Sequence, residues 1–344
     1  MAVCVKCKRE DPSCIDIKFA IYCSPCFLEA TYHKYRILLA RSRESLHCSP
    51  SRGLLLLPKD FLTSPQVYRA SRVLIHFSQL PSIQEPARKN LVTYDLAVPV
   101  GEDFEKVKMF VESVRAEYPL LGDIYTLSYA SGEIKKYHEC SNSAGVKDNY
   151  EECSNSAITI DDLDNLSNTL KEDLFNYKLL HLQLKLMNQL QVDRSCTPET
   201  STALASHILT CTCKGRGKFL PWDSALAQSF PGNLFFCRPL KEISDREIEL
   251  YCQEANFTNL FPSDHQTKTQ AISSLSIDQL TVNFLNNLES ENPGTANVVI
   301  RTSSKVTTVT DLSKVDENSV RCKICLAPND LEICPSCSPI RDFF

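Results

Sequence analysis

The chain has 344 residues, 43% of them hydrophobic and 23% charged, which suits one large domain or two modest ones and excludes global disorder. Only 9 residues are glycine, whereas about 25 would be expected from an average usage of about 7%. Neither G-x-G-x-x-G nor G-x-x-x-x-G-K-S/T occurs, so the two commonest nucleotide-binding fingerprints are absent. The net charge of −5 is unevenly distributed, because residues 1–90 carry +7 and residues 101–200 carry −8. The basic quarter is either a solvated surface or a surface that faces a polyanion.

The beginning of the chain has no apolar run of the kind found in secretory signals. The longest purely aliphatic run, Leu54 to Leu57, is far too short to span a membrane. We therefore expect a soluble, cytoplasmic protein with no membrane contact. Thiols stay reduced in that compartment, so clusters among the 17 cysteines are expected to bind metal rather than form disulfides.

Two sets of paired C-x-x-C motifs have the spacing of zinc sites. Their members are Cys4, Cys7, Cys23 and Cys26 in the first set, and Cys322, Cys325, Cys334 and Cys337 in the second. Four thiolates can surround Zn²⁺ tetrahedrally at about 2.3 Å, and a site with four protein ligands and no open position is structural. We predict two structural zinc sites, each stabilising a small module that cannot build its own core.

The remaining cysteines are less informative. Cys211-x-Cys213 together with Cys237 is either a cluster-binding or sulfur-carrying trio, or a set of buried small hydrophobic residues. The sequence assigns no role to Cys196.

The first expected elements are a basic helix and a buried strand. Apolar residues recur at helical spacing over 27–39, and Lys34 and Arg36 make this helix basic. The run Leu54–Leu57 predicts a short buried strand. Ser64 and Pro65 then have the pattern of a helix N-cap and first helical residue.

The helix that starts there is expected to reach about Gln79, with a strand over residues 73–75 as the alternative. Further expected elements are a strand over 91–98, a helix over 104–117 and a strand over 124–129. Residues 131–160 are predicted to be a polar insertion, because Glu139–Ala144 recurs 13 residues later as Glu152–Ala157. Metal binding with the help of His138 is the alternative function for this repeat.

Capping patterns predict the later helices. Thr169-x-x-Glu172 should open a helix that reaches about Leu190, in which His181 lies near the apolar face. Thr197 and Pro198 are expected to begin the next helix. A strand is predicted over 234–237, and Ser244-x-x-Glu247 should open a helix that ends near residue 255. Strands that alternate with helices indicate an α/β domain with a mostly parallel sheet.

Several segments, taken in order, resemble those of one protein family. They are Cys4-x-x-Cys7, Tyr22–Phe27, His33–Arg36, Asp193–Thr197, Gly215–Asp223, Arg238–Leu240, Arg301–Ser303 and Cys322-x-x-Cys325. This combination is similar to that of the cytoplasmic tRNA 2-thiolation protein 2 family. The resemblance implies a PP-loop ATPase-like fold, also called adenine nucleotide α-hydrolase-like, with zinc modules appended at both ends.

The resemblance also locates the segment that should bind ATP. Catalytic relatives carry an S-G-G-x-D-S loop after the first strand, whose glycines let backbone N–H groups approach the pyrophosphate. The corresponding segment is Pro58–Ser64, or Ser78–Ser82 in a rival alignment, and neither contains a glycine. We therefore expect that this chain alone binds no ATP and catalyses no adenylation.

By the same resemblance, the chain is the non-catalytic subunit of a heterodimer with a catalytic PP-loop tRNA thiolase paralogue. The heterodimer would 2-thiolate the wobble uridine of cytoplasmic tRNAs for Lys, Glu and Gln, forming 5-methoxycarbonylmethyl-2-thiouridine. A thiocarboxylated ubiquitin-like carrier would supply the sulfur and would be an indirect partner. Two alternatives stay open: a self-sufficient tRNA sulfurtransferase that uses internal cysteines, and a zinc-containing adaptor that binds only proteins.

The candidate tRNA contacts are basic residues next to glycine or on the basic helix. Lys214, Arg216 and Lys218 surround two glycines and can approach phosphates, although a turn beside a partner protein would look the same. Lys34 and Arg36 complete the set. The lone Trp222 is expected to pack in the core.

The expected organisation has four parts. A zinc module over 1–30 and a basic linker helix over 31–52 precede the α/β domain over 53–315, and a second zinc module occupies 316–344.

Overall fold

A central sheet organises the chain. The computed structural model describes residues 2–11, 14–17, 20–44, 52–84, 91–101, 103–137, 166–257, 275–306 and 320–344. Within these residues, seven strands pair in the order β10-β11-β9-β5-β6-β7-β8. They are β5 (Arg52–Leu56), β6 (Thr93–Val100), β7 (Ile124–Ser128), β8 (Glu133–Lys136), β9 (Arg194–Cys196), β10 (Ala227–Phe230) and β11 (Leu234–Cys237).

The sheet has the topology of a doubly wound α/β domain. The neighbouring strands from β11 to β7 run parallel, whereas β10 and β8 pair antiparallel at the two edges. The chain moves outward from β5 through β6 to β7 and then returns to β9 on the other side of β5. Sheets of this kind bind ligands beside such a reversal, outside the carboxyl ends of the strands. The segments that follow β5 and β9 therefore mark the expected site.

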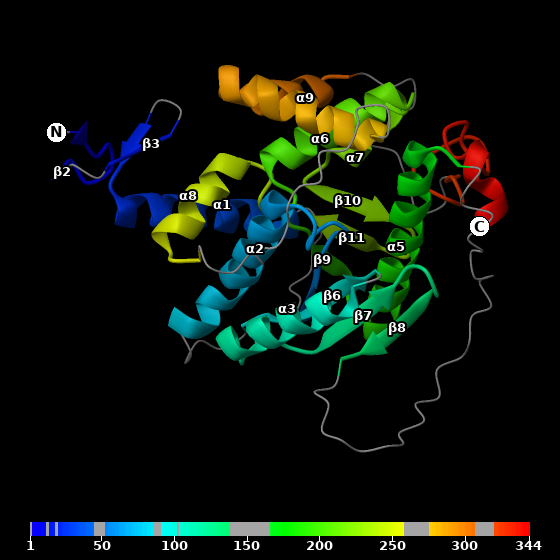
Figure 1. Ribbon diagram of the computed structural model, residues 1–344, viewed down its shortest axis with the longest axis horizontal. Coiled ribbons are helices and arrows are strands. Elements are labelled where there is room, and N and C mark those ends of the chain that lie inside the picture. The colour runs from blue at the N-terminus through cyan, green and yellow to red at the C-terminus, as the bar shows by residue number, and fades with distance from the viewer. Residues whose placement is uncertain are drawn as a thin grey trace, which may run out of the picture.

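Helices cover both faces of the sheet (Figure 1). They are α1 (Ser24–Glu44), α2 (Pro65–Gln84), α3 (Phe104–Glu117), α5 (Asn168–Leu190), α6 (Ser201–Cys213), α7 (Leu220–Asp223), α8 (Asp245–Glu254), α9 (Ile277–Glu291) and α10 (Thr295–Ser303), with 3-10 turns at Gly217–Phe219 and Ser338–Phe343. Side chains of α1, α2, α3 and α8 pack in one apolar cluster, and α5 packs in the other together with the C-terminal cysteines. The helices α6, α9 and α10 pack on one another at one edge of the domain.

The alternation of side chains along β5 separates these two clusters. Leu55 and Leu57 belong to the cluster that contains α2 and α3, whereas Leu54 and Leu56 belong to the one that contains α5. Successive side chains of a strand point to opposite faces, so one continuous leucine run serves both layers. This explains why no residue of the run Leu54–Leu57 is polar: both faces of the strand are buried.

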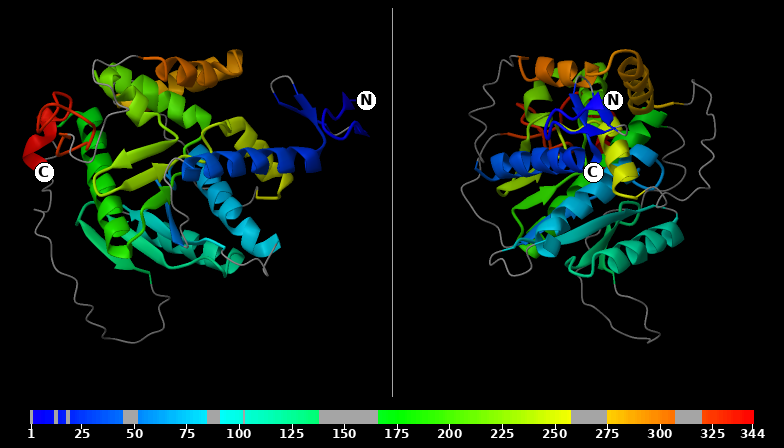
Figure 2. Two further views of the ribbon diagram at one scale, coloured as in Figure 1. Left: turned by 180° about the vertical axis from the view of Figure 1, so that it is seen from behind. Right: turned by 90° about the vertical axis from the view of Figure 1, so that its left-hand side faces the viewer.

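The two cysteine-rich ends lie at opposite ends of the molecule (Figures 1 and 2). The N-terminal end contains two small antiparallel pairs, β1 (Ala2–Val3) with β2 (Glu10–Asp11) and β3 (Ile15–Ile17) with β4 (Ala20–Tyr22). This end leads directly into α1, so the expected boundary at residue 30 falls inside that helix. The C-terminal cysteines pack against α5 at the other end.

The structure confirms most of the expected elements. The helix over 104–117 and the strand over 234–237 have the predicted bounds, and Ser244 and Glu247 form a reciprocal capping box. The alternative strand over residues 73–75 is wrong, because α2 is helical throughout and extends to Gln84. The repeat over 139–157 lies outside the described residues, and β8 occupies residues 133–136, at the start of the predicted insertion.

Two predicted helix starts are wrong by two or three residues. Ser167, not Thr169, caps α5 by accepting a hydrogen bond from the backbone N–H of Leu170. The Thr169 hydroxyl instead accepts a bond from the backbone of Ile277 at the start of α9. Thr200, not Thr197, caps α6, because the backbone N–H of Thr197 is engaged with the carbonyl of Cys237. In both places a second cap-forming residue lies nearby, and tertiary contacts decide between them.

The side chain of His76 makes stability dependent on pH. It lies on α2, accepts or donates a 3.0 Å hydrogen bond with the hydroxyl of Tyr118 and packs edge-on to Phe257. Burial lowers its pKa to about 4, although Glu117 opposes the shift. In the unfolded chain the imidazole takes up a proton at its ordinary pKa of 6.5. The stability that the neutral, buried side chain contributes is therefore complete above pH 6.5 and is lost as the pH falls to about 4. The free energy of unfolding is expected to fall by about 3 kcal/mol over this range. Urea unfolding of the wild type and of His76→Phe between pH 7 and 4 checks this, and equal pH profiles would contradict it.

Candidate functional site

A cavity of about 290 Å³ lies at the carboxyl ends of the central strands. The segment after β5, the segment after β9, and helices α5, α6 and α7 line it. Its acidic and basic lining residues are Lys59, Asp60, Glu199, His207, Arg216, Asp223 and Arg238. The position is the one at which this sheet topology binds ligands.

The segment that follows β5 is closed by its own hydrogen bonds. The backbone N–H of Phe61 donates to the carbonyl of Pro58, and those of Thr63 and Ser64 both donate to the carbonyl of Asp60. The side chains of Phe61 and Leu62 are buried in the core. Proline supplies no N–H at the first position. These amides are therefore turned inward, whereas a phosphate-binding loop needs several free N–H groups directed at one anion.

The rival alignment of the phosphate loop is wrong. Residues 78–82 lie inside α2, whose N–H groups are engaged in the helix. Of the two aligned segments, only residues 58–64 lie between a strand and the helix that follows it, as a phosphate loop does.

Ion pairs balance the charges in the cavity. The guanidinium of Arg238 binds Glu199, donates to the amide oxygen of Gln228 at 2.5 Å and donates to the carbonyl of Ala225 at 2.9 Å. The cavity is thus a polar, internally paired site.

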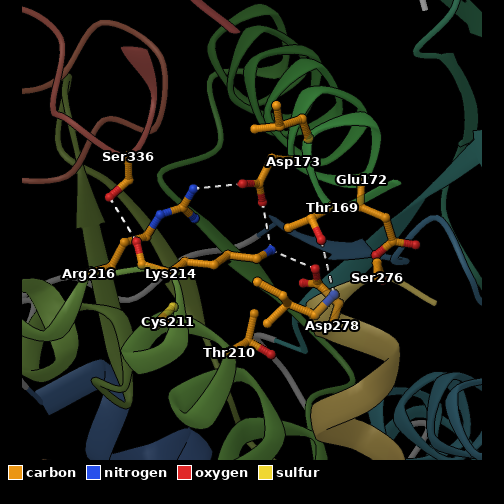
Figure 3. Close-up of polar contacts among 12 residues, drawn as sticks. Thr169, Glu172, Asp173, Thr210, Cys211, Lys214, Arg216, Ser276, Asp278 and Ser336 are labelled. Atoms are coloured by element: carbon orange, nitrogen blue, oxygen red, sulfur yellow. Dashed lines mark hydrogen bonds and ion pairs between the residues drawn. The ribbon is translucent and has the colours of Figure 1, made fainter. Parts of the chain in front are cut away.

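The basic segment Lys214–Lys218 contains buried charges at Lys214 and Arg216 and an exposed charge at Lys218. Figure 3 shows the contacts of Lys214 and Arg216. Lys214 contacts Asp173 at 2.9 Å and Asp278 at 2.5 Å, and Arg216 contacts the second oxygen of Asp173 at 2.9 Å. The side chains of Lys214 and Arg216 are only 6% and 8% exposed. Their charges are therefore used within the protein, which does not favour direct contact with a phosphate backbone.

The same segment joins three parts of the fold. Asp173 belongs to α5 and Asp278 to α9, while Ser336 of the C-terminal cysteine module donates its hydroxyl to the carbonyl of Lys214 at 3.1 Å. Arg216 also lies 5.2 Å from the ring centre of Tyr177. The segment is a structural junction.

The other three candidate tRNA contacts lie nearer the surface. Arg36 is exposed and stacks on Tyr32, and Lys218 is exposed and donates to the side chain of Asn329 at 2.6 Å. Lys34 is 41% exposed and pairs with the buried Glu247. The five predicted residues do not form one exposed patch, because Lys214 and Arg216 are buried.

The N-terminal cysteines converge as predicted. The sulfur atoms of Cys4, Cys7, Cys23 and Cys26 all lie within 4.8 Å of one another, and those of Cys7 and Cys23 are 3.6 Å apart. Tetrahedral zinc with Zn–S bonds of about 2.3 Å requires sulfur atoms about 3.8 Å apart. Hydrogen bonding from the backbone N–H of Cys7 lowers the pKa of Cys4, whereas hydrogen bonding with Cys23 raises the pKa of Cys26, so the four thiols do not all favour the thiolate that a metal needs.

The C-terminal cysteines form a second group that is wholly buried. The sulfur atoms of Cys322, Cys325, Cys334 and Cys337 lie within 4.8 Å of one another, and those of Cys325 and Cys334 are 3.9 Å apart. The backbone N–H of Cys334 donates to the sulfur of Cys322 at 3.4 Å. Such N–H···S bonds stabilise a metal-bound thiolate. Both groups can hold a metal ion.

The first C-x-x-C motif of each group makes the same turn. Lys8 follows Cys7 with φ 60°, Leu326 follows Cys325 with φ 59°, and each donates its backbone N–H to the carbonyl of the first cysteine at 2.9 Å. A left-handed conformation costs roughly 1–2 kcal/mol per non-glycine residue. The sequence gives no hint of this, because glycine is absent from both positions.

Replacement of Lys8 by glycine is expected to stabilise the N-terminal module. Lys8 is exposed, so the change removes backbone strain without loss of packing, and we expect a gain of about 0.5–1 kcal/mol. Resistance of this cysteine group to a competing chelator measures the effect. Lys8→Ala is the matched control, since alanine retains the strain, and an equal gain in both variants would contradict the explanation.

A third ligand-like group was not expected from the sequence. His207, Cys211 and Asp223 place one nitrogen, one sulfur and one oxygen within 4.8 Å of one another. Cys213 is exposed two residues further along α6, and Cys237 lies in β11. Among the described residues, neither belongs to a ligand-like group, so the structure does not assemble the trio of Cys211, Cys213 and Cys237. The signal in the sequence was the i, i+4 spacing of His207 and Cys211.

Two single-residue expectations are confirmed. His181 hydrogen-bonds to the carbonyl of Ile324 at 2.8 Å, which satisfies it in the way expected of a core histidine. Trp222 is 8% exposed, donates to the carbonyl of Ser229 and packs edge-on to Phe230. None of the described helices is both long and apolar enough to cross a membrane.

The sequence is similar to proteins of one family. A family model described as cytoplasmic tRNA 2-thiolation protein 2 matches residues 276–335. Cytoplasmic tRNA 2-thiolation protein 2-A of Xenopus laevis is 32% identical over 169 residues, which cover 48% of this chain and 32% of that protein. The protein of the same name in Drosophila erecta is 25% identical over 312 residues, covering 90% of this chain and 73% of that protein. The matched part thus spans about a third of the length of the Xenopus relative.

A solved structure shares the fold. It is the U34-tRNA thiolase NcsA from Methanococcus maripaludis with its 4Fe-4S cluster, and the superposition has a TM-score of 0.62 at 16% identity. The likeness covers 99% of this chain and 96% of that one. The expected PP-loop ATPase-like fold, a mainly parallel α/β sheet with a four-cysteine group at each end, is thereby confirmed.

Proposed function

We propose that the chain, which is similar to members of the cytoplasmic tRNA 2-thiolation protein 2 family, is the non-catalytic subunit of a tRNA thiolase heterodimer. Its partner is a catalytic PP-loop tRNA thiolase paralogue. The heterodimer 2-thiolates the wobble uridine of cytoplasmic tRNAs for Lys, Glu and Gln, and the product is 5-methoxycarbonylmethyl-2-thiouridine. A thiocarboxylated ubiquitin-like carrier delivers the sulfur to the catalytic partner, so its contact with this chain is indirect. The chain acts in the cytoplasm, in keeping with the names of its relatives.

The observation that carries this proposal is the segment after β5. It occupies the place of the phosphate loop, yet it has no glycine and the N–H groups of Phe61, Thr63 and Ser64 are engaged internally. A chain of this fold that cannot cradle a pyrophosphate supplies binding surface rather than adenylation chemistry. ATP is therefore bound by the partner and not by this chain alone.

The two four-cysteine groups hold structural zinc in this proposal. Each group has only thiolate ligands and no open position, the pattern of structural sites. The modules over 1–30 and 316–344 then flank the basic helix over 31–52 and the α/β domain over 53–315. Zinc is preferred to a 4Fe-4S cluster because four closed thiolates at tetrahedral spacing suit a single ion.

The tRNA contacts of this chain come from its exposed cations. Arg36, Lys218 and the partly exposed Lys34 can reach phosphates. Lys214 and Arg216 contribute indirectly, because their buried ion pairs hold the segment that presents Lys218. Phosphate contacts of this kind confer affinity that falls steeply with salt.

Purification of the tagged full chain from cells tests the partnership. A PP-loop thiolase and tRNA should co-purify with it, and metal analysis of the same sample should find zinc. In a filter-binding assay, the affinity for tRNA should fall steeply with salt. The double variant Arg36→Glu, Lys218→Glu should reduce the slope of log affinity against log salt concentration by about 2. Lys323→Glu is the control, since this exposed lysine already pairs with Glu332. Absence of tRNA binding at low salt would instead favour a protein-binding adaptor.

A further inference from the structure

Two adjacent helices bring three different ligand types to one point. His207 and Cys211 are four residues apart on α6, so their side chains project from the same face. The turn after α6 reverses the chain, and α7 returns Asp223 to that face. The cluster lies within the α/β domain and is separate from both four-cysteine groups.

The distances within the cluster are those of ligands around one ion. The Sγ of Cys211 is 3.5 Å from the Nε2 of His207 and 3.3 Å from the Oδ2 of Asp223, and the latter two atoms are 3.5 Å apart. Tetrahedral zinc has bonds of about 2.3 Å to sulfur and about 2.0–2.2 Å to nitrogen and oxygen, which places such ligand atoms about 3.3–3.6 Å from one another. All three observed separations fall in this range.

The cluster differs from a nucleophilic triad in the way the imidazole is used. A triad engages its nucleophile with one ring nitrogen of the histidine and its acid with the other. Here the same nitrogen, Nε2 of His207, faces both Cys211 and Asp223. One atom from each residue therefore points at a common centre, which is how a metal ion is bound.

Neighbouring side chains support the proposed ligands. The second oxygen of Asp223 accepts a 3.0 Å hydrogen bond from the amide of Gln228, whose own oxygen accepts a 2.5 Å bond from Arg238. Such a chain of contacts fixes the orientation of a metal-binding carboxylate. Cys211 is 1% exposed, whereas His207 and Asp223 both line the 290 Å³ cavity.

We propose that His207, Cys211 and Asp223 bind one zinc ion, whose fourth coordination position faces the cavity at the carboxyl ends of the strands. The mixture of thiolate, imidazole and carboxylate suits Zn²⁺. Three protein ligands leave one position for water or another small ligand, in contrast to the closed four-cysteine groups. This site goes beyond the proposed function and does not depend on it.

Metal content of the purified full chain tests the site by difference. His207→Leu, Cys211→Ala and Asp223→Asn should each contain one zinc equivalent per chain less than the wild type. Asp223→Asn keeps the shape of the side chain, so it separates metal loss from misfolding. Cys213→Ala is the matched control on the same helix, and its zinc content should be unchanged.

A second measurement uses the wild-type chain and needs no variant. A mild chelator should remove one zinc equivalent before the buried four-cysteine group is affected, because an open site exchanges more readily. Cobalt added afterwards should restore that equivalent and show a thiolate-to-cobalt absorption band, which Cys211→Ala should lack. Equal zinc content in folded wild type and all three variants would overturn the proposal, as would failure of the wild-type chain to take up cobalt. One equivalent of another metal at this site would overturn the assignment to zinc.

Discussion

Replacement of Cys334 by alanine is expected to unfold the C-terminal cysteine module and to destabilise the whole α/β domain. Structural zinc contributes on the order of 10 kcal/mol to folding in small modules, a large part of the total stability of a domain. Loss of one of four ligands should remove most of this contribution. Thermal denaturation and zinc content of the variant measure the effect, and we expect a large fall in Tm together with the loss of one zinc equivalent.

The loss of stability should extend to the α/β domain because this module is part of its core. Its four cysteines are buried and belong to the same apolar cluster as Leu54 and Leu56 of β5 and Phe236 of β11. Unfolding of residues 320–344 would expose this face of α5. The Ser336 contact to the carbonyl of Lys214 would be lost as well.

The N-terminal group supplies the matched comparison. Cys7 is exposed, and its module lies at the far end of the molecule. Cys7→Ala should also lose one zinc equivalent, but the main unfolding transition of the α/β domain should keep its Tm. Equal losses of stability in the two variants would contradict the unequal roles that the packing predicts.

Replacement of Asp173 by asparagine is expected to cost about 3–5 kcal/mol, because it leaves buried cations without their counter-charge. Asp173 is 7% exposed and binds both Lys214 and Arg216. Asp278 can still pair with Lys214, whereas Arg216 loses its anionic partner in this junction. Urea unfolding of the two chains measures the difference.

Two controls distinguish burial from charge alone. Glu332→Gln breaks the exposed pair with Lys323 and should change stability by less than about 0.5 kcal/mol. In a Lys214→Met, Arg216→Met background, Asp173→Asn should cost much less than in the wild type, because no cation remains to be stranded. An equal cost in both backgrounds would show that the ion pairs are not the reason for the effect.

Local patterns were sufficient to predict most of the architecture. The leucine run at 54–57, the helical spacing over 104–117 and the capping box at Ser244 each specify their element with few long-range contacts. The cysteine spacings predicted both four-cysteine groups for the same reason, since each C-x-x-C motif is a local turn.

The features that the sequence did not reveal depend on distant partners. Lys214 and Arg216 appear as free cations in the sequence, and only α5 and α9 supply the carboxylates that bury them. The group of His207, Cys211 and Asp223 likewise requires the turn between α6 and α7. Choices between nearby caps, such as Thr197 and Thr200, were decided by pairing with β11 and not by local preference.

ATP–pyrophosphate exchange in the presence of substrate tRNA tests the central claim most directly. The lone chain should give no exchange above background, because the segment over 58–64 turns its N–H groups inward. The same chain mixed with the proposed catalytic partner should give exchange. Robust exchange by the lone chain would contradict its assignment as a non-catalytic subunit.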